Sequence, residues 1–167
     1  ALFKESQKFR QKWVVAVVAI PLLIAVWGII QQLILNKPFG NNPAPDLALI
    51  LFFVVPLLLL AFYFTLTLHT RIDREGIRYR FAPVHRKEHL IKWEAIDKVF
   101  VRQYKPIAEY GGWGFRRGRS GRALNTKGKM GLQIIFKDGK KLLIGTQKPE
   151  ELEQVLKKLD FLSKPGD

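Results

Sequence analysis

WVVAVVAIPLLIAVWGII, residues 13–30, is an uninterrupted run of uncharged, mostly apolar residues, and it decides the fold class. Crossing the hydrocarbon core of a bilayer takes roughly 20 such residues in a helix, and the segment reaches that length at Leu35. A second run, LALILFFVVPLLLLAFYFTLTL, occupies residues 47–68. Because two runs of this length do not fit inside one small globule, we expect two transmembrane helices, at residues 13–35 and 47–68.

The segment between the runs, NKPFGNNPAPD at residues 36–46, is rich in Pro, Gly and Asn. It is short enough to be only a turn, so the helices should form an antiparallel hairpin. Basic residues flank the runs at Lys4, Lys8, Arg10 and Lys12 and at Arg71, Arg74, Arg78 and Arg80, whereas the connector holds only Lys37. By the positive-inside rule, both termini are expected in the cytoplasm, with residues 36–46 outside and residues 1–12 as a basic flank.

Composition narrows the classes of partner. The chain has 167 residues and a formal net charge of +14, which favours polyanions such as anionic lipid headgroups or nucleic acid. A membrane anchor favours lipid over nucleic acid. Cysteine is absent, which excludes disulfides, thiolate metal sites and S-acylation. The first apolar run is too long for a signal peptide, and we expect it to be retained.

After residue 68 the pattern changes to alternating apolar and polar residues, as in half-buried strands. We expect strands at residues 64–72, 77–81, 86–91 and 97–104. A hairpin is predicted at 132–136 and 141–144, because Asp138-Gly139 lies between two apolar runs. An amphipathic helix should follow over residues 149–159, opened by Pro149. The sequence therefore predicts a cytoplasmic, mostly β domain at residues 69–160, with a tail at 161–167.

Four motifs give this domain a family resemblance. They are IDREGI at residues 72–77, IKWEAI at 91–96, GGWG at 111–114 and GTQKPEEL at 145–152. In this order and spacing they resemble bacterial membrane proteins that carry a pleckstrin-homology-like (PH-like) domain after a two-helix anchor, over residues 10–160. The resemblance implies an antiparallel β-barrel or sandwich capped by a C-terminal helix, in the bacterial plasma (inner) membrane. It implies no catalytic residues.

The segment at residues 104–131 has no sustained period, many glycines and a dense set of arginines. Such long irregular connections are usually functional or disordered. Aromatic side chains could enter a membrane interface while guanidinium groups hold lipid phosphates. The candidate lipid- or partner-binding residues are Tyr110, Trp113, Phe115, Arg116, Arg117, Arg119 and Arg122. Two alternatives are a solvated run of charge, with Trp113 lying over the sheet, and a docking surface for a protein.

No catalytic or metal site is expected. The serines lie in flanks or in the glycine-rich segment, and His85 and His89 sit in a predicted strand without the acidic helper of a metalloprotease helix. We therefore expect no enzyme, no cofactor and no metal.

Two functions remain open. The first is a non-enzymatic, membrane-anchored adaptor or accessory subunit for a protein partner. The second is a module that binds or senses anionic phospholipid through residues 113–122. Nucleic acid is disfavoured because no RNA-recognition or helix-turn-helix motif is present. Transport is disfavoured because neither apolar run contains an ionisable residue.

Overall fold

The computed structural model of the protein describes residues 1–164, and the chain divides into two units. One unit, here called the β domain, is formed by Ala1–Phe9 together with the chain from Leu66 onward. The other, the helical hairpin, is Arg10–Thr65. The helical hairpin is therefore an insertion in the sequence of the β domain.

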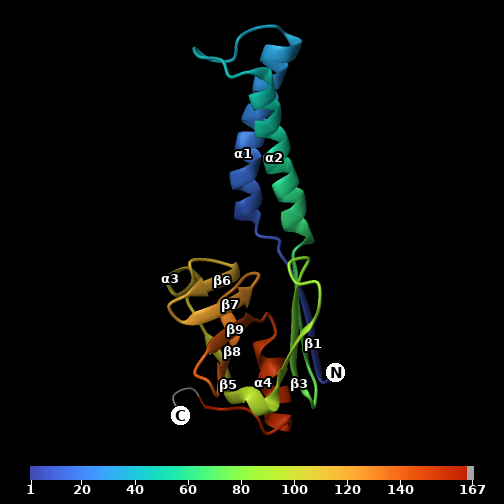
Figure 1. The fold of residues 1–167 in the computed structure, drawn as a ribbon, viewed down its shortest axis with the longest axis vertical. Coiled ribbons are helices and arrows are strands. Elements are labelled where there is room, and N and C mark those ends of the chain that lie inside the picture. The colour runs from blue at the N-terminus through green and yellow to red at the C-terminus, as the bar shows by residue number, and fades with distance from the viewer. Residues whose placement is uncertain (165–167) are drawn as a thin grey trace. The chain divides into compact units, whose positions relative to one another are not determined.

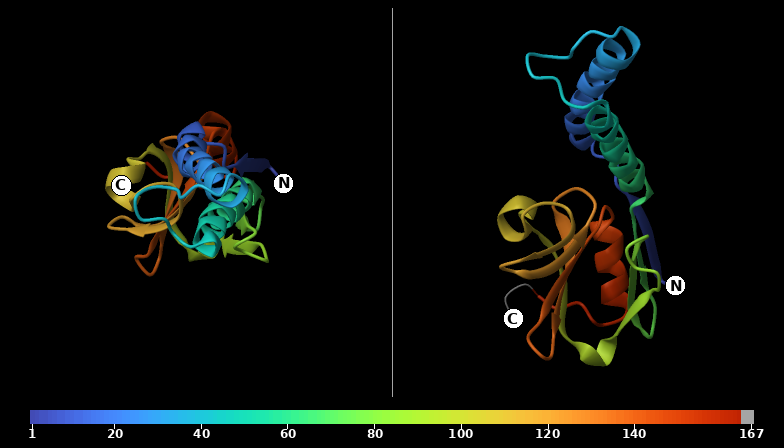
Figure 2. Two further views of the ribbon diagram at one scale, coloured as in Figure 1. Left: turned by 90° about the horizontal axis from the view of Figure 1, so that it is seen from above. Right: turned by 45° about the horizontal axis from the view of Figure 1, so that its top comes forward.

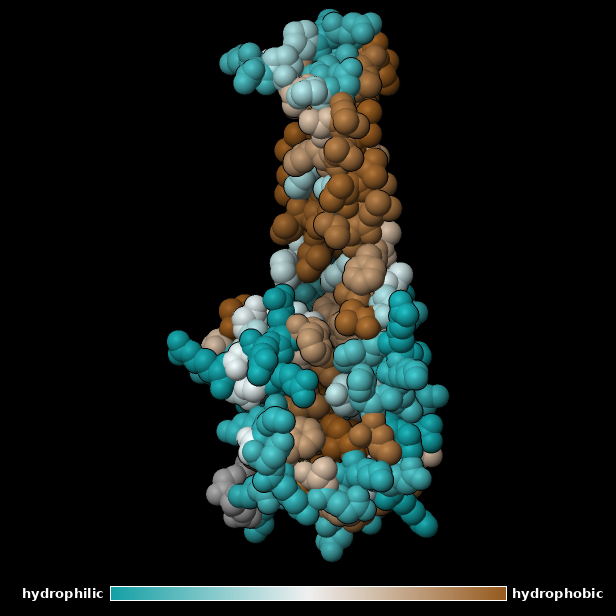
Figure 3. All heavy atoms as spheres, in the orientation of Figure 1, coloured by the Kyte–Doolittle hydropathy of each residue, from teal (hydrophilic) through white to brown (hydrophobic). Residues whose placement is uncertain are grey.

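The helical hairpin contains the two apolar helices that the sequence predicts (Figure 1). Helix α1, Lys12–Ile29, continues into a π-helical turn at Ile30–Ile34, and α2 is Asp46–Thr65. By length and composition both could cross a membrane, with spans of 23 and 20 residues. Figure 3 shows that apolar residues cover the outside of these helices, as expected for surfaces that meet lipid rather than water.

Polar contacts hold the turn of the helical hairpin. The Gln32 side-chain amide donates to the Ala44 carbonyl at 2.8 Å and to Asp46 Oδ1 at 2.6 Å. The Phe39 ring lies against Gly28, where an added Cβ would be 3.1 Å from the ring. A glycine at this position lets the connector fold closely onto α1.

Two sheets make up the β domain (Figure 1). Sheet A has the order β1-β2-β3-β4, all antiparallel, with β1 at Phe3–Lys8, β2 at Thr67–Ile72, β3 at Gly76–Ala82 and β4 at His89–Lys92. A 3₁₀ turn at Trp93–Ala95 leads into the second sheet.

Sheet B has the order β5-β8-β9-β7-β6. Its strands are β5 at Ile96–Gln103, β6 at Gly114–Gly118, β7 at Gly121–Asn125, β8 at Met130–Phe136 and β9 at Lys141–Gly145. The pairing of β7 with β9 is parallel, and the other pairings in sheet B are antiparallel. The short helix α3, Pro106–Tyr110, precedes β6.

The core lies between the inner faces of the sheets. Leu68, Ile77 and Phe81 of sheet A and Leu132 and Ile144 of sheet B are at most 2 % exposed. Helix α4, Pro149–Lys158, lies between the sheets on one side, as the right-hand view of Figure 2 shows, and contacts β1, β5 and β8. Its apolar stripe, Leu152, Val155 and Leu156, is buried there, in agreement with the amphipathic helix that the sequence predicts.

Several predicted boundaries were wrong. Residues 1–12 are not only a flank, because Phe3–Lys8 forms an edge strand of sheet A. The second apolar helix ends at Thr65, and Leu68 belongs to the core of the β domain. A continuous apolar run does not distinguish a helix from a buried strand, which explains the overextended helix. The strand predicted at 86–91 begins only at His89.

Two further segments differ from expectation. Residues 104–131 are not one irregular loop but contain α3 and the β6–β7 hairpin. Residues 161–163, predicted as tail, pack on the domain: the Phe161 ring stacks on Trp93 at 4.1 Å, and the Ser163 amide donates to the Val99 carbonyl at 2.8 Å. The rest of the predicted tail, from residue 165, lies outside the described residues.

Candidate functional site

The β6–β7 hairpin is built around glycines that permit close approach. Gly118 and Gly121 face each other across the hairpin, with Arg119 and Ser120 at the tip. A Cβ at Gly118 would lie 2.1 Å from the Glu109 carbonyl oxygen, and one at Gly121, where φ is +103°, would lie 2.6 Å from that of Lys141. No side chain fits at such distances. These glycines therefore fix the hairpin against α3 and β9 rather than making it flexible.

The three predicted aromatic residues do not act together. Tyr110 is 3 % exposed, and its hydroxyl accepts a hydrogen bond from Arg102 Nη2 at 3.3 Å. Trp113 is half-buried, and its Nε1 donates to the carbonyl of Gly128, in the connection between β7 and β8, at 3.1 Å. Phe115 is 50 % exposed. Only Phe115 among the three presents a freely exposed ring.

The four predicted arginines also separate. Arg116 Nε donates to the Trp113 carbonyl at 2.9 Å, and this bond holds the Arg116 side chain beside Trp113. The other three line one hollow of about 550 Å³ together with two lysines from the β8–β9 turn. We call this hollow the basic pocket; its lining is Arg117, Arg119, Ser120, Gly121, Arg122, Gly139, Lys140 and Lys141.

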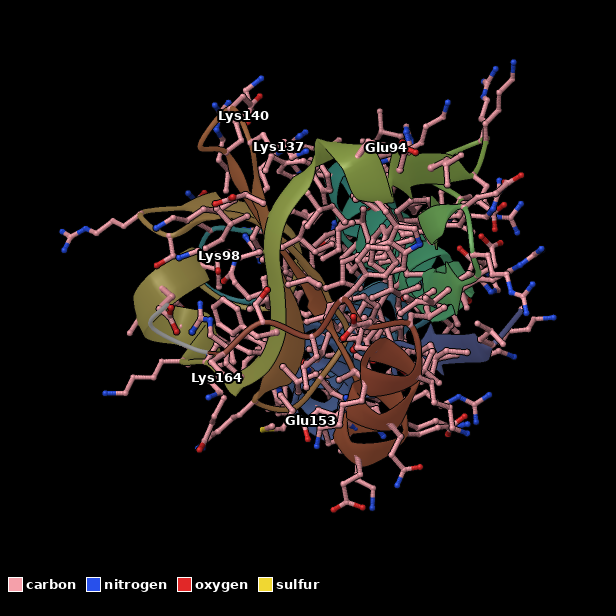
Figure 4. All side chains as sticks on the ribbon, turned by 90° about the horizontal axis from the view of Figure 1, so that it is seen from below. Glu94, Lys98, Lys137, Lys140, Glu153 and Lys164 are labelled. Carbon is pink, nitrogen blue, oxygen red and sulfur yellow. The ribbon has the colours of Figure 1, made fainter. Side chains whose placement is uncertain are left out.

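Sequence reasoning missed the two lysines: it predicted the β8–β9 hairpin that carries them but not the β6–β7 hairpin beside it. The basic pocket forms because β7 runs parallel to β9, with Arg122 beside Leu142. That pairing brings the tip of the β6–β7 hairpin to the β8–β9 turn. Figure 4 shows Lys140 at the tip of this turn, pointing outward from the edge of the domain.

Charge in the basic pocket is almost unneutralised. Within residues 1–164, Arg117, Arg119, Arg122 and Lys141 have no ion-pair partner, and Lys140 pairs only with Asp138, at 3.2 Å. Arg117 stands directly opposite Arg122 across the hairpin. Like charges in that position repel and destabilise a sheet.

The carboxylate that contacts Ser120 of the pocket, Glu109, is already engaged. Ser120 Oγ donates to Glu109 Oε1 at 3.3 Å, and Arg102 Nη2 donates to the same oxygen at 2.8 Å. The hydrogen bond from Arg102 is the main cause that holds the pKa of Glu109 below its ordinary value of 4.5. Glu109 therefore stays charged, but its charge is matched by Arg102 and not by the pocket.

A second surface lies where the two sheets open, and we call it the aromatic cluster: Tyr79, His85, His89 and Phe115. The rings of His85 and His89 are 4.6 Å apart, and Tyr79 stacks on His89 at 5.2 Å. The Phe115 ring meets the edge of His85 at 5.6 Å, which links sheet B to sheet A. Burial, and then the charges of His89 and Arg122, lower the pKa of His85, so this imidazole is neutral at pH 7.

Strand β1 contributes a buried polar network. Glu5 accepts hydrogen bonds from Thr146 Oγ1 at 2.7 Å and from the Gln147 amide at 2.8 Å. Gln7 donates from Nε2 to the Gly145 carbonyl at 2.7 Å and accepts from Thr126 Oγ1 at 3.0 Å. The inward face of β1 is therefore joined to sheet B by fully matched donors and acceptors.

Comparison with known proteins identifies the family of the chain and nothing more specific. The profile of a family of unknown function, DUF6141, matches residues 1–159. The chain belongs to the DUF6141 family. Neither a curated protein nor a solved structure matches it.

The extent of the DUF6141 match is informative. It runs from β1 through α4 and includes the helical hairpin. The family match therefore covers the β domain together with the helical hairpin inserted in it. Among the described residues of this member, no three His, Cys, Asp or Glu side chains gather as a metal site would require.

Proposed function

We propose that this DUF6141 member is a non-enzymatic, membrane-anchored adaptor whose PH-like β domain binds a protein partner at the cytoplasmic face of a bacterial plasma membrane. The observation that carries the proposal is the aromatic cluster, a group of contacting rings from both sheets in which His89 and Phe115 are exposed and Tyr79 and His85 are partly buried. Aromatic side chains that remain exposed on a folded domain are typical anchors of protein interfaces.

The placement in the membrane is supported by the insertion. The Phe9 amide donates to the Leu66 carbonyl at 3.3 Å, so the chain leaves and re-enters the β domain at adjacent points. Two spans between these points return the chain to the side on which it started. The basic flanks favour the cytoplasm as that side.

The PH-like assignment is supported by two sheets with an amphipathic C-terminal helix between them. Two features depart from the simplest version of that plan. The helical hairpin interrupts the first strand pair, and the β6–β7 hairpin adds a parallel pairing to sheet B.

The partner's chemistry follows from the surface. Phe115 and the neighbouring loop residue Val84 are 50 % and 51 % exposed, so an apolar side chain can be buried against them. Arg122 lies close enough to act on the charge of His85. An acidic segment with an apolar side chain matches both the exposed apolar side chains and this basic border.

The test compares two exposed apolar residues on the same domain. Phe115→Ser removes a ring from the aromatic cluster, whereas Ile107→Ser changes an α3 residue that is 69 % exposed and is not part of it. Full-length protein is crosslinked in cells, purified in mild detergent and analysed by mass spectrometry. A stoichiometric partner should be retained by Ile107→Ser and reduced at least about tenfold by Phe115→Ser.

Equal recovery of every partner by the two variants would contradict the adaptor proposal. The same purification counts co-purifying phospholipids, which addresses the second candidate function, binding of anionic headgroups. A separate observation, the basic pocket, favours that candidate.

A further inference from the structure

The basic pocket has the composition of a site for a multiply charged anion. Its lining contributes five cations and no carboxylate. By contrast, Arg78 pairs with Asp73, Glu75 and Glu88, and Arg102 pairs with Glu109. Within residues 1–164 other cations without a carboxylate partner, such as Arg86 and Lys92, occur elsewhere on the domain, but the basic pocket gathers five cations around one hollow.

The backbone around the pocket is built to hold the cations together. Arg117 and Arg122 belong to paired strands, and Lys141 begins the strand that pairs with β7. Only glycine fits at Gly121, because the Lys141 carbonyl lies against it. The repulsion between Arg117 and Arg122 persists in the free protein, and an anion between them would relieve it.

The lining also limits the ligand's chemistry. Besides the cations it contains Ser120 and two glycines, with no aromatic or aliphatic residue to hold a nucleobase or an acyl chain. Guanidinium groups suit phosphate oxygens because they donate two parallel hydrogen bonds. Five cations exceed what a single phosphate would match.

We infer that the basic pocket binds a ligand that carries two or more phosphate groups, recognised through Arg117, Arg119, Arg122, Lys140 and Lys141. Two sources present this chemistry: a free polyphosphate and the phosphorylated headgroup of an anionic lipid. The basic pocket and the aromatic cluster share no lining residue, although Arg122 of the pocket also borders the cluster, and the pocket's ligand does not depend on the adaptor function.

The experiment uses full-length protein in nanodiscs of phosphatidylcholine. Inorganic tripolyphosphate is titrated calorimetrically at fixed pH and ionic strength. Arg117→Gln with Arg122→Gln removes one side of the pocket, and Lys140→Gln with Lys141→Gln removes the other. Lys92→Gln with Lys157→Gln is the matched control, because it removes the same formal charge from exposed positions elsewhere on the β domain.

Each pocket variant should weaken binding at least about tenfold, while the control changes it less than about twofold. All substituted side chains are exposed, so melting temperatures should stay close to that of the unmodified protein. An unchanged melting temperature would also show that a variant that no longer binds is still folded.

A second arm identifies the source. Nanodiscs that also contain a phosphoinositide are analysed by native mass spectrometry. If the unmodified protein retains the lipid, both pocket variants lose it and tripolyphosphate does not bind, the site belongs to a lipid headgroup. If tripolyphosphate binds and the lipid is not retained, the site belongs to a free polyphosphate. The inference is overturned if neither probe binds, or if the control variant loses as much binding as the pocket variants.

Discussion

Strand β1 and the β6–β7 hairpin are two basic segments that look alike in sequence and behave differently in the structure. Residues 1–12 were expected to be a basic flank and residues 104–131 an irregular segment, but β1 and β6 are edge strands of their sheets, and β7 lies next to β6. In β1 the lysines point outward, while Glu5 and Gln7 are buried and hydrogen-bonded. In the β6–β7 hairpin, Arg117 and Arg122 face each other without a carboxylate.

The difference lies in what each segment's polar groups already contact. A buried polar group with matched partners contributes to folding, and its removal leaves those partners unsatisfied. An exposed cation opposite another cation destabilises the strand pair, and an incoming anion would relieve the repulsion. Strand β1 therefore belongs to the architecture of the domain, and the β6–β7 hairpin is the segment to which we ascribe the proposed binding.

The strongest way to break this comparison is to separate β1 from the rest of the chain. Residues 66–167 alone lack the edge strand and the buried side chains of Phe3 and Phe9, and we expect them not to fold. Joining Phe9 to Leu66 through Asn-Gly in place of residues 10–65 should give a folded, water-soluble domain, because this dipeptide closes a two-residue hairpin.

Circular dichroism and the dispersion of amide signals in NMR spectra distinguish these outcomes. A cooperative unfolding transition in the version without β1 would show that the strand is dispensable, and the contrast with the β6–β7 hairpin would then fail.

A smaller effect is expected from Glu5→Ala. The substitution leaves the Thr146 hydroxyl and the Gln147 amide without their acceptor, which should lower the free energy of unfolding by about 2–4 kcal/mol. Lys4→Ala, on the outward face of the same strand, should change it by less than about 0.5 kcal/mol. Urea unfolding of the Asn-Gly version measures both, and equal values for the two variants would argue against a structural role for the buried network.

The smallest effect concerns Glu109, the carboxylate that separates Arg102 from the basic pocket. The pKa of Glu109 is lowered in the folded protein, chiefly by Arg102. Ionised Glu109 therefore contributes its full stabilisation above about pH 4.5, the ordinary pKa of the group. That stabilisation is lost as the pH falls through the lowered pKa of the folded protein. Glu109→Gln should cost about 1–2 kcal/mol at pH 7, and the cost should shrink as the pH falls below 4.5. Unfolding measured against pH tests this, and a constant difference between the two proteins would contradict it.

Much of the fold could be predicted from the sequence where the signal is local. The apolar helices, the β8–β9 hairpin around Asp138-Gly139 and the start of α4 at Pro149 agree with the structure. Each depends on the length of an apolar run, on turn chemistry or on helical periodicity, and each can be read within a short window.

The missed features depend on contacts between distant residues. Strand β1 pairs with residues beyond the helical hairpin, and its buried Glu5 and Gln7 break the apolar alternation that marks a strand. The candidate residues from Phe115 to Arg122 were found by composition, but Lys140 and Lys141 join them only through the parallel β7–β9 pair. Tyr110 appeared as a surface aromatic because nothing nearby in sequence reveals Arg102 as its partner.

The insertion of the helical hairpin within the β1–β2 pair sets an order on biosynthesis. The ribosome makes β1 before residues 10–65, and only afterwards the strand that pairs with β1. Until that moment β1 has no neighbour in its sheet, so the β domain cannot close while the apolar helices are still being made. Whatever machinery receives these helices acts on a nascent chain whose domain is unfinished, because Glu5 of β1 finds its partners Thr146 and Gln147 only after both helices have been made.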